Sequence, residues 1–138
     1  MTDVVATHRL THAASLKMLQ AGVAKAEEIG CQVSLAVVDQ SCRLIAFLMM
    51  DGARHFSIVT TTRKAITSAS QRQPTGYAPE ENALSMSVRM GDFTNVPGGF
   101  PIAVGGEVIG AVAAGGAQIE QDVMVAKAAL AALDLPAS

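Results

Sequence analysis

Residues 101–125, PIAVGGEVIGAVAAGGAQIEQDVMV, contain the pattern that decides the fold. Two apolar runs are separated by the glycine pair 105–106, which is the signal of a β-hairpin with a tight turn. A second glycine pair, 115–116, follows the hairpin. Beyond it the apolar residues recur every three or four positions, which predicts a helix that begins at Ile119.

The rest of the chain supplies a second hairpin and two long helices. Residues 33–50 hold two apolar runs joined by a short polar link, and Thr11 and Gly30 are typical helix start and stop residues. The order α-β-β-α-loop-β-β-α has no βαβ crossover, so we expect one α+β domain over residues 1–138, an antiparallel sheet covered by helices. The predicted elements are helix 11–29, strands 33–39 and 44–50, helix 57–71, a short helix 80–90 in a long loop, strands 101–104 and 108–114, and helix 119–133.

Small side chains dominate the apolar half of the composition. The chain has 24 alanines and 12 glycines among 138 residues, whereas aromatic residues make up 4%. Such a core is built by close approach of backbones rather than by packing of rings. The many small, weakly polar residues left at the surface predict subunit contacts, and we expect a homo-oligomer, a dimer or larger.

Charge and hydropathy exclude several classes of function. The formal net charge is −2 with a pI near 5.8, and no basic cluster is present, which argues against a nucleic-acid partner. No apolar stretch approaches the roughly 20 residues of a membrane span, and the N-terminal residues lack the pattern of a secretory signal. We therefore expect a cytoplasmic protein with no membrane partner.

Two candidate catalytic residues follow the second glycine pair, 115–116, and a third lies in the predicted central helix. The residues after it open a helix whose first turns carry Glu120 and Asp122, and free N–H groups at a helix start favour an anion. Both carboxylates also fit a purely electrostatic role beside the helix dipole. Lys64 lies in the predicted central helix, where it could reach a cleft or simply face solvent. Lys64, Glu120 and Asp122 are candidate catalytic groups.

Three histidines are candidate ligands of a metal or haem. His8 and His12 have the i, i+4 spacing that can hold a metal on a helix, but Thr11 is the expected helix cap, so we predict no metal site. His55 precedes the central helix and has better access to a cleft, which makes it a candidate acid, base or haem ligand. The chain has no C-x-x-C-H motif, so any haem would be bound non-covalently.

Five segments together resemble a known family. VSLAVVD, MDGA, RKA, GGFPI and GEVIGAVAAGGAQIEQD occur in this order from residue 33 to residue 122 and are similar to the GlcG/HbpS-like haem-binding (haem-degrading) family, which includes the C-terminal domain of PduO-type proteins. The resemblance implies a profilin-like fold, homo-oligomers, haem binding in some members and small-molecule catabolism in others. Recurrent family positions fall on Lys64, Gly98, Gly99, Gly115, Gly116, Glu120, Gln121 and Asp122.

The chain departs from the family pattern at three places. Cys42 stands where the family usually has Gly, Ala114 where it usually has Ser, and residues 92–97 replace an apolar strand that helps to line the pocket in haem binders. Phe93 belongs to this segment. The residues expected to border a cofactor are His55, Phe93, Gly98, Gly99, Gly115 and Gly116.

Three functions remain open on these grounds. The first is a haem or tetrapyrrole binder, which the resemblance favours. The second is an enzyme or auxiliary protein of a catabolic pathway, an isomerase, lyase or hydrolase for a small organic acid; the scarcity of rings and the altered 92–97 segment favour it. The third is a non-catalytic assembly or regulatory domain.

Overall fold

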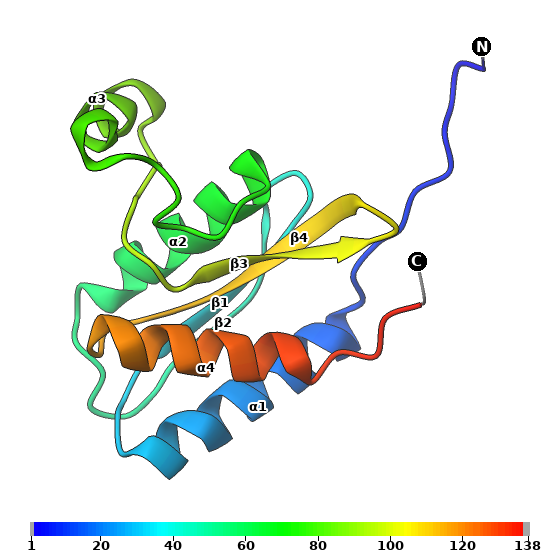
Figure 1. The fold of residues 1–138 in the computed structure, drawn as a ribbon. Helices are drawn as coiled ribbons and strands as arrows, with labels where there is room; N and C mark the ends of the chain where they lie inside the picture. Colours follow the sequence, from blue (N-terminus) through cyan, green and yellow to red (C-terminus); the bar gives the residue numbers. More distant parts are fainter. Residues whose placement is uncertain (1, 137–138) are drawn as a thin grey trace.

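The computed structural model describes residues 2–136 as a four-stranded antiparallel sheet with helices on both faces (Figure 1). The strand order is β2-β1-β4-β3, so the two hairpins lie side by side and β1 and β4 form the centre. The α+β architecture predicted from the sequence is confirmed. The elements are α1 (His12–Ile29), β1 (Ser34–Asp39), β2 (Leu44–Met49), α2 (Ser57–Gln71), α3 (Glu80–Met90), β3 (Gly99–Val104), β4 (Glu107–Gly115) and α4 (Ile119–Ala131).

The first helix begins and ends at the residues that its sequence predicts. The Thr11 side chain accepts a hydrogen bond from the Ala14 N–H at 3.0 Å and so caps the first turn. At the other end Gly30 adopts φ 78°, and its N–H bonds to carbonyls of the last turn. A left-handed residue is best supplied by glycine, because a Cβ is strained there.

The Thr11 cap leads to a first prediction. Thr11→Ala removes the acceptor of the Ala14 N–H, so we expect the free energy of unfolding to fall by about 1 kcal/mol. Urea denaturation followed by circular dichroism measures the change. Thr2→Ala is the matched control, because the Thr2 hydroxyl bonds within the exposed N-terminal arm and its loss should leave stability unchanged.

The two faces of the sheet are packed in different ways. Helices α1 and α4 lie together on one face, and large side chains such as Met18, Leu35, Val37 and Val112 fill the space beneath them. Helix α2 covers the other face, where the buried cluster consists of Val38 and the alanines Ala36, Ala65, Ala69, Ala111 and Ala113. Side chains of this size let α2 approach the sheet closely, as the alanine-rich composition predicts.

Some boundaries differ from the prediction. Strand β3 begins at Gly99 instead of residue 101, because the Gly98 carbonyl and Gly99 pair with Ala114 and Ala113 and extend the ladder through the glycine pair. Strand β4 runs over Glu107–Gly115, one residue longer at each end, and α4 ends at Ala131. None of the helices described here has the length and apolar character needed to cross a membrane.

Candidate functional site

Lys64 and Asp122 meet in a buried ion pair at one end of the sheet. The Lys64 Nζ donates to Asp122 Oδ2 at 3.1 Å and to the Ala114 carbonyl at 3.0 Å. Lys64 comes from α2 and Asp122 from α4, so the pair joins helices on opposite faces of the sheet around the end of β4. Both side chains are almost fully buried, so the pair serves first to hold the two helices together.

The glycine pairs 98–99 and 115–116 surround the ion pair of Lys64 and Asp122. A Cβ at Gly98 would lie 2.9 Å from Lys64 Nζ, and one at Gly99 would lie 2.6 Å from the Lys64 carbonyl oxygen. A Cβ at Gly115 would collide with the Thr61 hydroxyl, and one at Gly116 would lie 2.9 Å from the Cβ of Ser57. In the folded chain these glycines therefore let β3 and β4 approach α2 closely, and Gly116 also lines a pocket of about 210 Å³ beside Arg54 and Gln118.

The start of α4 is paired within the chain. Gln118 and Gln121 form a reciprocal capping box, and Asp122 Oδ1 accepts the Ala117 N–H at 3.0 Å. The N–H groups of Ala117, Gln118 and Gln121 at this helix start thus already have partners within the chain. Glu120 lies on the exposed side of the same turn, away from the buried Lys64.

The histidines and Phe93 lie apart from one another. His55 is exposed in the turn before α2, with its ring edge-on to the exposed Phe56 at 5.9 Å between ring centroids. Phe93 is buried against Tyr77 beside residues 66–70 of α2, roughly 17 Å farther along that helix at 1.5 Å per residue. The structure does not bring His55 and Phe93 into one pocket.

No metal centre forms among residues 2–136. This part of the chain contains no group of three or more His, Cys, Asp or Glu side chains placed to hold a metal ion. His8 precedes the capped start of α1 and lies 3.8 Å from Glu107 instead of pairing with His12 across a helical turn.

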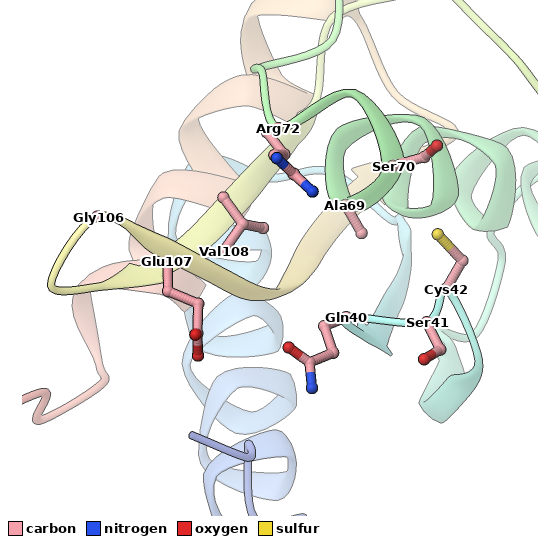
Figure 2. Close-up of a pocket in the computed structure, with 9 residues that line it drawn as sticks. All are labelled: Gln40, Ser41, Cys42, Ala69, Ser70, Arg72, Gly106, Glu107 and Val108. Carbon is pink, nitrogen blue, oxygen red and sulfur yellow. The ribbon is translucent and has the colours of Figure 1, made fainter. Parts of the chain in front are cut away.

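A pocket opens at the end of the sheet opposite the ion pair of Lys64 and Asp122 (Figure 2). It has a volume of about 550 Å³ and lies among the β1–β2 turn, the end of α2 and the β3–β4 turn. The Arg72 side chain extends from the end of α2 over the space bordered by Val108 and Ala69. The lining residues are Gln40, Ser41, Cys42, Ala69, Ser70, Arg72, Gly106, Glu107 and Val108.

The backbone is strained on two sides of this pocket. Cys42 has φ 64° and Arg72 has φ 59°, and they are the two non-glycine residues with positive φ in the described part of the chain. Side chains rarely adopt this left-handed conformation, which costs roughly 1–2 kcal/mol per residue. Such strain tends to be retained at functional sites, where the position of a side chain matters more than stability.

The two charged side chains that line the pocket differ in their partners within the chain. Glu107 accepts hydrogen bonds from the Thr7 hydroxyl at 2.7 Å and the His8 N–H at 3.2 Å, and these bonds lower the pKa of its carboxyl group. Arg72 makes no ion pair or side-chain hydrogen bond to the described residues. Its guanidinium is therefore the cation that is free to bind an anionic ligand in the pocket.

The Cys42 thiol borders the pocket as a neutral group. Burial, and to a smaller extent the Asp39 carboxylate, raises the pKa of the thiol, which points to the Ile66 carbonyl at 3.6 Å. The pocket can thus recognise a polar anion with Arg72, the Gln40 amide and the Ser41 hydroxyl. Sequence reasoning missed Gln40, Ser41 and Arg72; the one available signal was Cys42, where the usual glycine of the family suggests a left-handed turn.

Comparison with known proteins confirms the resemblance. The family model described as "Haem degrading protein HbpS-like" matches residues 10–131. The chain belongs to the HbpS-like family. The protein GlcG of Escherichia coli K12 is 34% identical to it over 113 residues, which cover 80% of this chain and 81% of GlcG.

Solved structures share the fold over nearly the whole chain. A double mutant of HbpS from Streptomyces reticuli superposes with a TM-score of 0.87 at 29% identity, covering 96% of this chain and 92% of that one. A complex of PduOC with haem superposes with a TM-score of 0.85 at 21% identity, covering 94% and 98% of the two chains. The sheet order and helix arrangement of this HbpS-like chain are thus those of its structural relatives.

Proposed function

We propose that this HbpS-like chain binds a small organic carboxylate in the pocket of Figure 2, as an auxiliary protein of small-molecule catabolism in the cytoplasm. The observation that carries the proposal is the Arg72 guanidinium, which lines a pocket of about 550 Å³ without an ionic partner among the described residues. Pockets for small ligands usually measure about 300–1,000 Å³. The planar guanidinium fork matches the two oxygens of a carboxylate.

The other polar groups narrow the ligand class. The Gln40 amide and the Ser41 hydroxyl lie on the far side of the opening from Arg72, so they suit a second polar group of the ligand. Glu107 is held ionised by Thr7 and His8 and would repel a second carboxylate placed beside it. A short hydroxy or oxo monocarboxylate therefore fits better than a dicarboxylate.

Calorimetric titration with a panel of small carboxylates tests this proposal. We expect saturable binding of hydroxy or oxo monocarboxylates, and Arg72→Gln should weaken it at least about 10-fold because the paired charge is lost. Arg89→Gln is the matched control, since Arg89 lies on α3 outside the pocket. Equal weakening by both substitutions, or none by Arg72→Gln, would remove the pocket from consideration.

Haem binding is the second candidate, favoured by the description of the family and by the haem complex of PduOC. An apolar groove of about 470 Å³ runs along α1, but its lining (Leu16, Leu19, Gln20, Val23, Ala24, Glu27 and Leu48) offers no imidazole, thiol or thioether to iron. His55 is exposed, and Phe56 is the ring beside it. A haemin titration that gives a saturable Soret shift, lost in His55→Ala, would support this candidate over the carboxylate proposal.

A further inference from the structure

A second pocket of useful size adjoins the β1–β2 turn, and the proposed carboxylate site does not use it. It has a volume of about 500 Å³ and opens between this turn and the N-terminal arm, residues 7–11, with Ile109 of β4 also on its wall. We call it the arm pocket. Gln40 and Ser41 line both the arm pocket and the pocket of Figure 2, so the two pockets are neighbours.

The N-terminal arm is held against the sheet beside this pocket. Figure 1 shows the arm passing the β3–β4 turn, and there the Thr7 hydroxyl and the His8 N–H both bond to Glu107. Leu10 is buried in the core beneath α1. Arg9 lies between these two anchored residues, so its backbone has a fixed place at the arm pocket.

The β1–β2 turn supplies a second arginine to the arm pocket. Asp39 Oδ1 accepts the N–H groups of Ser41 at 2.9 Å and of Arg43 at 3.0 Å, which fixes the turn. Arg43 Nε lies 3.3 Å from Asp39 Oδ2, and the Arg43 side chain is 80% exposed. A guanidinium carries N–H donors on each of its nitrogens, so this one contact leaves donors for a ligand.

The arm pocket has more positive charge to offer than the pocket of Figure 2. Arg9 is exposed and makes no ion pair or side-chain hydrogen bond to the described residues. The nearby carboxylates are already engaged, Asp39 by two backbone N–H groups and Arg43, and Glu107 by the arm. Although the net charge of the chain is −2, three of its six arginines border these two neighbouring pockets, and two of the three border the arm pocket.

We propose that the arm pocket binds the phosphoryl group of a small phosphate monoester through Arg9 and Arg43. Such a group carries between about 1.5 and 2 negative charges at pH 7, and the arginine fork matches pairs of its oxygens. Two guanidinium groups thus suit a phosphoryl group, whereas the single Arg72 suits a monocarboxylate. A volume of about 500 Å³ exceeds the needs of a bare phosphate ion, which leaves space for an organic part against Ile109.

Calorimetric titration of the full chain with butyl phosphate, in phosphate-free buffer at about 0.1 M salt, tests the site. We expect saturable binding, about 10-fold tighter than that of butyrate, which has a similar chain but a single charge. Arg9→Gln and Arg43→Gln should each weaken it about 10-fold. Both side chains are exposed, so the variants should keep the circular dichroism of the wild type. Arg89→Gln, on α3 outside both pockets, is the control for the loss of one positive charge.

Two further comparisons identify the source of the phosphoryl group and separate the two pockets. Inorganic phosphate should bind more weakly than butyl phosphate, and binding at least as tight would overturn the monoester in favour of the free ion. Arg72→Gln should weaken the binding of monocarboxylates but not that of butyl phosphate, so either site can fail without the other. Absence of binding, equal weakening by Arg89→Gln, or loss of butyl phosphate binding in Arg72→Gln would each overturn the proposal.

Discussion

Asp122→Asn should lower the free energy of unfolding by about 3–5 kcal/mol, because it leaves the ammonium of Lys64 buried without its charge partner. The Ala114 carbonyl alone would then neutralise none of that charge. Glu120→Gln, two residues earlier on the exposed side of α4, is the matched control and should change stability by less than about 0.5 kcal/mol. The chain has no tryptophan, so urea unfolding is best followed by circular dichroism, at one fixed protein concentration.

The interaction itself can be separated from the loss of either side chain. Lys64→Met should cost much less in the Asp122→Asn background than in the wild type, because the uncompensated charge is then removed. A coupling energy of about 2 kcal/mol is expected for groups in direct contact. Additive effects of the two substitutions, or a loss below 1 kcal/mol for Asp122→Asn, would show that the pair does not hold α2 and α4 together.

Most of the fold could be predicted from local patterns. The glycine pair 105–106, the polar link of the first hairpin and the ends of α1 each have a local physical cause, and the structure confirms these elements. The predicted start of β3 at residue 101 is wrong, because Gly98 and Gly99 have the composition of a loop. Their place in the ladder depends on β4 and on Thr75, which are distant in sequence.

The candidate site was harder to predict because it depends on long-range pairing. Lys64 and Asp122 were each selected from the sequence, but their contact across 58 positions leaves no local signal. The role of the glycine pairs is equally hard to predict from sequence. A nearby ligand and a nearby helix both require small residues for the same steric reason, so the pattern does not say which of them is present. The pocket of Figure 2 joins three turns, and two of its left-handed residues, Cys42 and Arg72, are not glycines.

Gly115→Ala is the second substitution with a large expected effect. Its Cβ would collide with the hydroxyl of Thr61 and lie 3.3 Å from the Nζ of Lys64. Thr61 is fully buried on α2, so relief of the collision must displace the Thr61 side chain within the core or move α2 away from the sheet. Overpacking of this kind costs about 1–3 kcal/mol, and the displaced Lys64 adds to it, so we expect a loss of about 3 kcal/mol in urea unfolding.

A size exchange at Thr61 provides the decisive control. The Thr61 hydroxyl is the one buried side-chain polar atom without a hydrogen-bond partner in the described chain, so Thr61→Ala gives up no hydrogen bond. Thr61→Ala should therefore rescue much of the stability of Gly115→Ala. Gly22→Ala offers a contrast, because its Cβ would meet the terminal methyl groups of the buried Leu35 and no group of α2, and the substitution improves helix propensity. If Gly115→Ala behaves like Gly22→Ala, or Thr61→Ala does not rescue it, the close approach of β4 to α2 is not what requires glycine at this position.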